Sequence, residues 1–531
     1  MLKSSSQKPL LLSFKLFVLL STKLYLIKRS IFVFFTYFPF FSTNNLGMKK
    51  LILLLLSVIF SLPVWGQFEN FELLVPQKDH AFVMPDVENT VVSTTGNVDP
   101  VLVDMLNTTL ANELSIRGAI GFSAALVLPD GEAWSGAVGR NNAAGDPFLP
   151  EMVSGIGSVT KTITGACIME LVEEGKVNLD APISDYLGSF PNVTATATVR
   201  QLLNHTSGIY SYTDNPAVND SVSKDFSRVW APEEILNNFI LAPLFNPGDS
   251  WSYSNTNYVL LGLIIEEVTG NEYHVEIRNR FWSALNLEGI YLYPQETPTE
   301  TFVNLWADLF GGGTALDLSI LGVTREGLFS MGWAAGAVIA TPETIARWMK
   351  LLTDGEAITP TALAMMEDFL PLTNTYGYGL GLTRTRLPDG NYIFGHSGNI
   401  IYQSEVNAVP DLGISISVLT NDGTQNGCGN TWLALYNTYK AYLALVGTNE
   451  TFNAQPLHFF PNPTSGNVTL DLTAGSLDYL EVRNTLGQVV WKTNQTLMGN
   501  VEIPAADWTS GIYQLMGKDG NQSWQGKMIK N

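Results

Sequence analysis

The chain has 531 residues, of which 46% are hydrophobic and 15% are charged, so it can form more than one domain with a sizeable core. Its formal net charge is −20, which argues against nucleic acid and anionic lipid as partners, because both attract surfaces rich in Lys and Arg. We therefore expect an acidic soluble protein with no stable membrane span in its mature form.

The first 66 residues differ from the rest, since they hold eight of the 29 Lys and Arg residues and no Asp or Glu. A basic start at Met48 is followed by an apolar run over residues 51–62 and by small or modest residues up to Gly66. This is the pattern of a secretory signal peptide that is cut after Gly66. We assign residues 48–66 to a signal peptide and expect export.

Residues 1–47 precede this complete export signal, and we interpret them as a doubtful N-terminal extension ahead of a true start at Met48. The alternative is a membrane helix over Leu16–Phe41, but Lys and Arg residues interrupt that segment. Each would cost about 2.5–3.5 kcal/mol in the middle of a bilayer, so we favour the first interpretation.

Three turn sequences predict an antiparallel sheet in the body of the chain. After a leader over residues 67–100, which we expect to pack irregularly, Pro-Asp-Gly at 129–131 separates two strand-like runs. The same motif returns at 388–390, and a looser version occupies 410–413. Proline presets φ in such turns and glycine accepts positive φ. Each turn therefore predicts a hairpin, and the sheet combines early strands with late ones.

A helical region lies between these hairpins. Ser158–Glu174 is apolar almost all round and precedes a glycine, as expected of a buried helix, and Asn257–Val268 repeats this pattern. Thr341-Pro342-Glu343 has the residues of a helix start. We predict an α+β fold, in which a mostly helical insert interrupts an antiparallel sheet, in one domain over residues 101–446.

Only two cysteines occur in the chain. Export permits a disulfide, but two distant cysteines form no framework, and Cys167 falls on the buried helix. We therefore expect Cys167 and Cys428 to be free thiols.

A polar segment over residues 447–456 predicts a linker, and a β-rich unit follows over 457–531. Its short strands and frequent turns indicate a small sandwich. Asn-Pro-x-x-Gly at 462–466 and Gly-Ile-Tyr at 511–513 resemble the C-terminal sorting domains of the type IX secretion route. The resemblance implies that this unit binds the secretion machinery and directs the protein to the cell surface or the medium. The alternative is a carbohydrate-binding or adhesive module.

Ser158 and Lys161 are the first candidates for chemistry. The sequence has no His-Glu-x-x-His, Cys-x-x-Cys or P-loop motif, so we expect no metal and no cofactor. On a helix, Ser158 and Lys161 share one face, and a residue in the first turn lies where a developing anion is favoured. A buried lysine can accept the proton of an attacking serine. The alternative is a solvated pair on a helix surface.

Two further motifs follow in order, Tyr253-Ser254-Asn255 and His396-Ser397-Gly398. Together with Ser-x-x-Lys they resemble the class C β-lactamases and the related D-Ala-D-Ala carboxypeptidases and esterases. Segments 202–208, 333–341 and 376–381 also look like recurrent sequences of that group, and the resemblance covers roughly residues 100–446. It implies a serine hydrolase of the β-lactamase/transpeptidase-like fold.

The resemblance implies a role for each matched residue. Ser158 is the nucleophile, and Lys161 and Tyr253 share its proton. A phenolate-like Tyr253 is the favoured base, which requires Lys161 to lower a pKa that is ordinarily about 10. Asn255 holds the amide carbonyl of the substrate and orients Lys161. The backbone N–H groups of Ser158 and Asn399 form the oxyanion hole.

His396, Ser397 and Gly398 would line the side that receives the leaving part of the substrate. Some of these residues also have purely structural interpretations: Tyr253 as a core aromatic, Asn255 as a helix cap, and His396 as packing at the end of a strand. His205 is interpreted as structural.

The third motif carries histidine where class C β-lactamases carry lysine, and histidine is mostly neutral at pH 7. A substrate carboxylate would then depend on Ser397 and on Arg384 or Arg386. We predict a D-Ala-D-Ala carboxypeptidase, D-peptidase or β-lactamase-related amide hydrolase that acts on a small peptide, amide or ester. The alternatives are an esterase on the same scaffold and a non-catalytic penicillin-binding surface protein.

Overall fold

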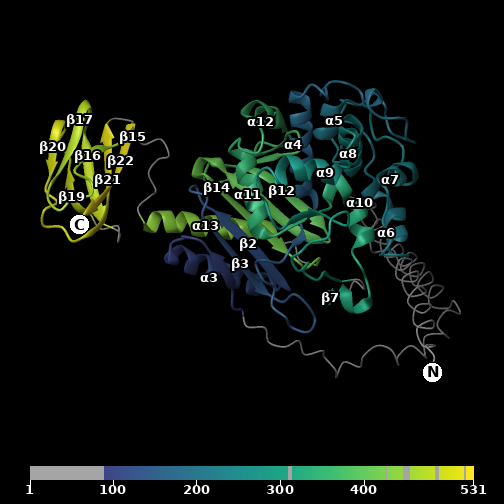
Figure 1. The fold of residues 1–531 in the computed structure, drawn as a ribbon, viewed down its shortest axis with the longest axis horizontal. Helices are drawn as coiled ribbons and strands as arrows, with labels where there is room; N and C mark the ends of the chain where they lie inside the picture. The colour runs from purple at the N-terminus through teal and green to yellow at the C-terminus, as the bar shows by residue number, and fades with distance from the viewer. Residues whose placement is uncertain are drawn as a thin grey trace, which may run out of the picture. The chain divides into compact units, whose positions relative to one another are not determined.

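The computed structural model describes residues 89–308, 314–424, 427–446, 455–484, 489–519 and 522–530. The predicted signal peptide and N-terminal extension lie outside these residues. The described chain forms a large α+β body and a small C-terminal β unit (Figure 1).

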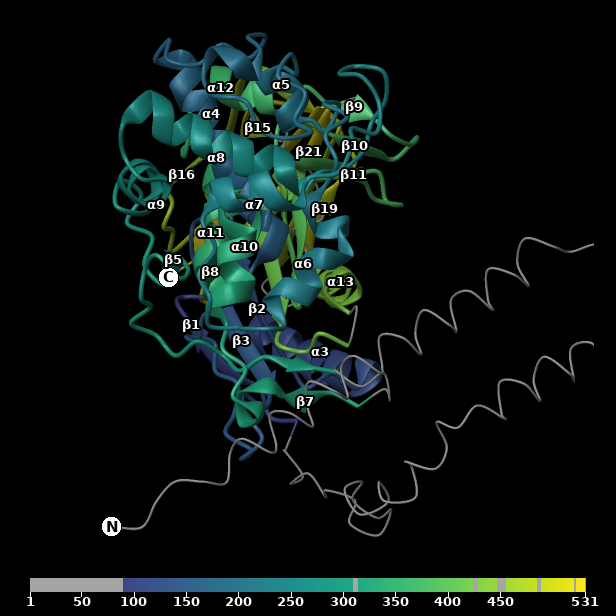
Figure 2. The same cartoon turned by 90° about the vertical axis from the view of Figure 1, so that its right-hand side faces the viewer.

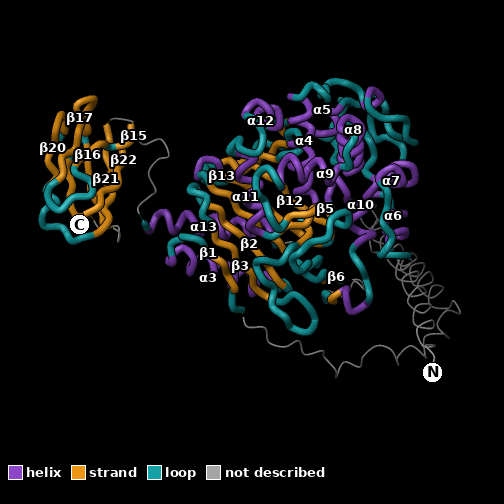
Figure 3. The backbone as a smooth tube through the Cα atoms, in the orientation of Figure 1, coloured by secondary structure: helices purple, strands orange, loops and turns teal. Residues whose placement is uncertain are grey.

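The centre of the large body is a nine-stranded antiparallel sheet (Figure 3). In spatial order its strands are β1 (Val92–Thr95), β3 (Ala133–Gly139), β2 (Gly121–Val127), β14 (Ile414–Thr420), β13 (Tyr402–Val409), β12 (Tyr392–Ile400), β11 (Thr383–Arg386), β10 (Tyr376–Tyr378) and β9 (Leu370–Pro371). The three predicted hairpins join β2 to β3, β11 to β12 and β13 to β14. Early strands pair with late ones through β2 and β14, so the predicted fold class is confirmed.

Two helices, α3 (Pro100–Arg117) and α13 (Cys428–Leu445), pack together on one face of the sheet. Their buried side chains join those of β2, β3 and β14 in one apolar core. On the other face lies α11 (Pro342–Thr353), which begins as the sequence predicts, with the side chain of Thr341 capping the helix.

The helical insert has its own large core. Its α-helices are α4 (Thr160–Glu173), α5 (Val199–Leu203), α6 (Pro216–Val222), α7 (Pro232–Phe239), α8 (Asn255–Thr269), α9 (Tyr273–Ile277) and α10 (Glu326–Gly336). The π-helical turn η5 (Arg278–Trp282) follows α9. The 3₁₀ turns are η2 (Gly157–Val159), η3 (Ile183–Asp185), η4 (Tyr212–Asp214) and η6 (Leu318–Leu321). A further helix, α12 (Pro360–Met366), packs on α4. Figures 1 and 2 show α4, α5 and α8 gathered on the side of the sheet away from α3.

Short strands complete the large body. They are β4 (Ser154–Gly155), β8 (Val338–Ala340) and β5 (Ile290–Leu292) in one small sheet, and β6 (Trp306–Ala307) and β7 (Leu316–Asp317) in another. The turn between β13 and β14 is the 3₁₀ segment η7 (Pro410–Leu412).

The end of the expected leader differs from the prediction. Residues Val92–Thr95 form the edge strand β1, which pairs with β3, and are not packed irregularly. Only one of its four side chains is even partly buried, so the sequence carries little of the apolar alternation that marks a strand. The strand forms because its backbone pairs with the edge of β3 that does not pair with β2.

The C-terminal unit contains two sheets around a core of its own. One has the order β15 (Gln455–Pro456), β22 (Gln522–Lys530), β21 (Gly511–Asp519), β18 (Tyr479–Asn484) and β19 (Val489–Thr493). The other has β16 (His458–Phe460), β17 (Val468–Leu477) and β20 (Leu497–Ile503). The predicted small sandwich is confirmed.

Both cysteines are buried and free, as predicted. In the part of the chain that the structure describes, no helix is both long and apolar enough to cross a membrane.

Candidate active site

Ser158 lies on the turn η2, directly ahead of α4. A Cβ on Gly157 would lie 2.5 Å from the backbone nitrogen of Asn399, and a Cβ on Gly398 would lie 1.9 Å from the carbonyl oxygen of Ile156. Because both positions are glycine, β12 packs backbone against backbone on this turn. The structure therefore brings the backbone N–H of Asn399 beside the turn that carries Ser158, as an oxyanion hole from these two residues requires.

Lys161 lies in the first turn of α4, and its side chain is fully buried. Its Nζ lies 3.0 Å from the Oγ of Ser158, 2.7 Å from the Oδ1 of Asn255 and 2.6 Å from the carbonyl oxygen of Ala335. None of these partners is a carboxylate. Burial therefore lowers the pKa of Lys161 well below its usual value, because no anion compensates for the lost hydration of the ammonium group.

The third partner of Lys161 depends on a break in α10. Trp333 has φ of 35° and ψ of −126°, which interrupts the helix, and its ring lies against Gly262 of α8. The carbonyl oxygens that follow point toward α4: that of Ala334 accepts from Thr164 at 2.7 Å and that of Ala335 accepts from Lys161. Such a backbone conformation costs about 1–3 kcal/mol and is found where the surroundings over-determine it. Sequence analysis missed Ala335, because a backbone acceptor has no residue type to mark it.

Asn255 opens helix α8, but its side chain does not cap that helix. Its Oδ1 accepts from Lys161, and its Nδ2 donates to Thr213 at 3.0 Å. Its backbone N–H donates to the hydroxyl of Ser211 at 3.1 Å. The orienting contact to Lys161 is therefore present, and Thr213 and Ser211 are supporting residues that sequence analysis did not find.

Tyr253 places its hydroxyl in the same site, with Lys161 Nζ 5.0 Å from the ring centroid. Burial raises the pKa of Tyr253, and a contact with Ser158 only partly opposes that effect. This corrects the expectation that Lys161 lowers the pKa of Tyr253. Burial disfavours charge on both groups, so the resting pair is a neutral phenol and a lysine of low pKa. Within the described residues, the Tyr253 hydroxyl has no hydrogen-bond partner of normal geometry.

His396 lies on β12 and is only 4% exposed. Its Nε2 lies 3.0 Å from the hydroxyl of Tyr378, and its Nδ1 lies 2.5 Å from the carbonyl oxygen of Ser397, which can only accept. Nδ1 therefore carries the proton, and Nε2 accepts. Burial, and then the proximity of Lys161, lower the pKa of His396 to about 3, so the ring is neutral.

Ser397 and Asn399 are exposed and Gly398 is partly exposed, so this end of β12 faces the solvent beside Ser158. Arg384 lies elsewhere: its guanidinium stacks over the rings of Phe369 and Tyr392, at 4.7 and 5.3 Å. Neither Arg384 nor Arg386 lines the cavity next to Ser158.

That cavity has a volume of about 290 Å³, and Ser158 and Asn399 are among the residues that line it. Its apolar lining comes from Val218, Val222, Leu328, Met331, Ile400 and Ile401. Among the described residues that line it, none carries a charge. A neutral and largely apolar group of a substrate therefore fits this space.

The described residues contain no cluster of three or more His, Cys, Asp or Glu side chains that could hold a metal ion. What the site does contain is a hydroxyl, an amine of lowered pKa and a phenol, and this set is suited to acyl transfer through a nucleophilic serine.

An antiparallel sheet with a helical insert, and a Ser-x-x-Lys pair at their junction, define the β-lactamase-like class of fold. Residues 106–436 match the family model described as Beta-lactamase, so the chain belongs to that family. Residues 458–531 match the secretion system C-terminal sorting domain, here of the type IX route, which indicates export across the outer membrane.

Known proteins are similar to the large body. A D-stereospecific amidohydrolase from Streptomyces sp. is 28% identical with a TM-score of 0.55, over 63% of this chain and 98% of that one. The D-amino acid amidase from Ochrobactrum anthropi SV3 is 26% identical with a TM-score of 0.56, over 64% of this chain and 99% of that one. The chain is thus related in structure to enzymes that are hydrolases.

Among curated proteins, Protein flp of Staphylococcus aureus (strain N315) is 35% identical over 139 residues, which are 25% of this chain and 26% of that protein. The chain spans only about a quarter to a third of the length of the curated relatives it matches.

Proposed function

We propose that the protein is an exported serine hydrolase that cleaves amide bonds through an acyl-enzyme on Ser158, with amides or short peptides of D-amino acids as its substrates. The observation that carries this proposal is the environment of Lys161. Its amine is fully buried, lies 3.0 Å from Ser158 and is otherwise contacted by the neutral oxygens of Asn255 and Ala335.

A neutral Lys161 fits its three contacts as a general base. Its two N–H groups donate to the oxygens of Asn255 and Ala335, and its lone pair faces the O–H of Ser158. As Ser158 Oγ attacks the substrate carbonyl, its proton passes to Lys161. The N–H groups of Ser158 and Asn399 hold the oxyanion that forms, a type of interaction whose loss typically costs about 2.7–4 kcal/mol.

Collapse of the intermediate requires a proton on the leaving nitrogen. The Lys161 ammonium gives the leaving nitrogen the proton it has taken from Ser158, and the neutral phenol of Tyr253, which contacts Ser158, can donate a hydrogen bond to that nitrogen. The amine then departs, and water attacks the ester on Ser158 with Lys161 again as base. Each cycle consumes one water molecule and leaves the protein unchanged.

The lining of the cavity supports a substrate that has no carboxylate there. It has no cation among its described residues, His396 is a neutral ring with both nitrogens engaged, and Arg384 stacks on aromatic rings away from it. A terminal carboxylate, as in D-Ala-D-Ala or penicillin, therefore has no guanidinium or ammonium partner in this cavity. This favours amides with an apolar acyl group over carboxypeptidase substrates.

The D-configuration is supported by the two similar structures, a D-stereospecific amidohydrolase and a D-amino acid amidase. The sorting domain supports a substrate outside the cell, such as external peptides. The same proposal includes the role of Tyr253 and the oxyanion hole formed by the N–H groups of Ser158 and Asn399. It also places the leaving group beside Ser397 and Gly398, and it assigns residues 48–66 to a signal peptide.

The test follows the release of ammonia from D-phenylalanine amide by the purified protein and by Ser158→Ala, with L-phenylalanine amide as the stereochemical control. Benzylpenicillin and p-nitrophenyl acetate are run in parallel, and intact mass records any adduct. We expect turnover of the D-amide by the native protein alone. Turnover of the p-nitrophenyl ester without any amide would support the esterase alternative. No detectable turnover of any acyl donor would support a non-catalytic binding protein.

A further inference from the structure

His205 lies between α5 and η4 and adopts a left-handed backbone conformation, with φ of 64°. Its carbonyl oxygen accepts from the backbone N–H of Ser252 at 3.0 Å, and its Nδ1 accepts from the backbone N–H of Ser254 at 3.2 Å. The two residues that flank Tyr253 are therefore both bonded to one residue. Left-handed φ is uncommon for non-glycine residues, and a side chain that bonds locally makes it tolerable.

The ring of His205 also packs on Tyr253. The two ring centroids are 4.3 Å apart, and the ring of Tyr378 lies 4.7 Å away on another side. The imidazole is fully buried, and because Nδ1 accepts a hydrogen bond, the ring proton of the neutral form lies on Nε2. The contact between the two buried rings therefore limits the positions open to the Tyr253 ring.

The neighbouring residues extend the same set of contacts. Ser207 donates to the side chain of Asn257 at 2.8 Å, and Tyr258 donates to the carbonyl oxygen of Leu203 at 2.8 Å. These two bonds reach residues of α8 that follow the Tyr253-Ser254-Asn255 motif, so they do not hold the motif itself. Ser252 and Ser254 are held by His205, and Asn255 is held by Ser211.

We propose that His205 is a positioning residue for the reaction: its carbonyl oxygen, Nδ1 and ring together hold the backbone of Ser252–Asn255, so that Tyr253 and Asn255 converge on Ser158 and Lys161. This inference rests on the proposed function for its kinetic readout. It assigns no contact with substrate to His205. A displacement of about 1 Å at a catalytic group can cost about 100-fold in rate, so the contact with Ser254 has a measurable consequence.

The experiment separates the acceptor from the ring. In His205→Asn, the amide oxygen takes the place of Nδ1, and asparagine tolerates positive φ, so the bond from Ser254 is kept while the ring is lost. His205→Phe keeps a ring and loses the acceptor, and His205→Ala loses both. His274→Asn is the matched control, because His274 lies on α9, where its Nδ1 is 3.4 Å from Glu272.

We expect His205→Ala and His205→Phe to lose about 10–100-fold in kcat with a smaller change in KM, and His205→Asn to recover at least part of that loss. His274→Asn keeps the native values. Kinetics within twofold of native for both the Ala and Phe variants would overturn the proposal, as would an Asn variant no better than Ala.

A second measurement does not depend on activity. Hydrogen exchange of the Ser254 amide is expected to be slow in the native protein and in His205→Asn, and faster in His205→Ala and His205→Phe. If the native protein turns over no acyl donor, the proposed function fails while this measurement still decides the positioning role. Equal exchange of this amide in all four proteins would overturn the role whatever the kinetics show.

Discussion

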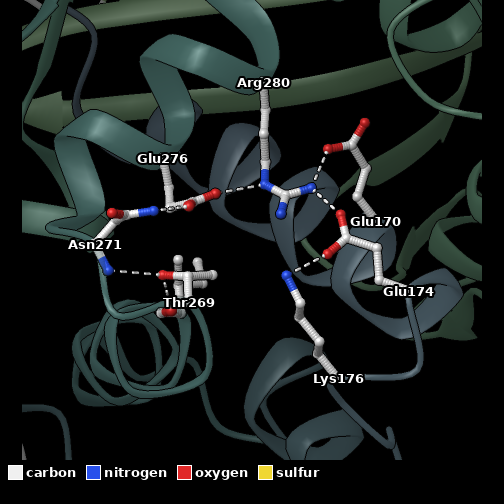
Figure 4. A network of polar contacts seen from close by, with 8 residues as sticks. Glu170, Glu174, Lys176, Thr269, Asn271, Glu276 and Arg280 are labelled. Atoms are coloured by element: carbon white, nitrogen blue, oxygen red, sulfur yellow. Dashed lines mark hydrogen bonds and ion pairs between the residues drawn. The ribbon is translucent and has the colours of Figure 1, made fainter.

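A basic side chain contacts helix α4 at each of its ends, and the two side chains differ in their acceptors. At its start, Lys161 is bound by a hydroxyl, an amide oxygen and a backbone carbonyl. At its end, Glu170 and Glu174 bind Arg280, at 2.9 and 2.5 Å, and Glu276 binds the same guanidinium at 2.7 Å (Figure 4). Lys161 has only neutral partners, and Arg280 has three carboxylates.

The consequences for charge are opposite. Burial opposes the charge of Arg280, but the hydrogen bonds that Arg280 donates to Glu174, Glu170 and Glu276 outweigh burial and raise its pKa above the usual value. Lys161 has no such compensation, and its pKa falls. Removing one member of a buried, fully paired set of charges is destabilising, whereas a buried amine without an anion is available as a base.

The largest expected effect comes from removing the amine. Lys161→Met keeps a side chain of similar length but no base, and we expect kcat to fall by about 10⁴-fold, as when one member of a catalytic set is lost. Stability changes little, because two effects oppose each other. The buried amine is no longer desolvated, while the oxygens of Asn255 and Ala335 lose a donor, so the free energy of unfolding shifts by less than about 2 kcal/mol.

Steady-state kinetics and urea unfolding of the same preparation check this prediction. If Lys161→Met is unfolded without urea, its loss of activity follows from the loss of the fold. Lys161 would then be a structural residue like Arg280, and the contrast between the two ends of α4 would be wrong.

A smaller effect follows from giving Lys161 the partner that it lacks. In Asn255→Asp, a carboxylate replaces the oxygen that lies 2.7 Å from Nζ. An opposite charge at this distance raises a lysine pKa by about 1–3 units. In the proposed mechanism the active form has a neutral Lys161, and the fraction of this form rises with pH. The acid limb of the kcat/KM profile is therefore expected to move to higher pH. On the acid limb, below both pKa values, we expect about 10–1000-fold less activity than native, with recovery in more alkaline buffer.

Asn255→Leu is the matched control for that profile. It removes the same hydrogen bond without adding charge, so its activity falls while its acid limb stays near the native position. An Asn255→Asp profile that coincides in pH with the native one would mean that Lys161 does not set the acid limb.

The sequence predicted the fold and the pairing of Ser158 with Lys161 for a physical reason. Pro-Asp-Gly turns and an i, i+3 spacing act within a few residues, so neither depends on the rest of the chain. The raised pKa of Tyr253 and the carbonyl of Ala335 could not be read in this way. The pKa of Tyr253 depends on how deeply its phenol is buried. The position of the Ala335 carbonyl depends on the break in α10 at Trp333, whose ring packs against Gly262.

The edge strand β1 shows the same limit on the fold. Its residues have almost no buried face, and their conformation is decided by the edge of β3 that lies next to them. Position relative to a partner, and not residue type, decides the structure there.

The smallest effect on activity comes from the other end of α4. We expect Arg280→Met to lower the free energy of unfolding at pH 7 by about 2–3 kcal/mol, since it leaves three carboxylates close together without their shared donor. We expect kcat to stay within about twofold of native, because the Lys161 contacts are untouched. Lys176→Met is the matched control: Lys176 pairs with the same Glu174 at 2.8 Å, but its side chain is 46% exposed, so the loss is below about 1 kcal/mol.

The pH dependence of this stability difference gives a further check. The hydrogen bond from Arg280 lowers the pKa of Glu174 to about 2, from a model-peptide value near 4.5. A lowered carboxyl pKa stabilises the folded state above pH 4.5, and this contribution is lost as pH falls toward 2. The difference in unfolding free energy between native protein and Arg280→Met should therefore narrow over that range in urea titrations. A difference that stays constant down to pH 2 would show that Arg280 stabilises the helix junction by packing. The contrast in charge between the two ends of α4 would then concern Lys161 alone.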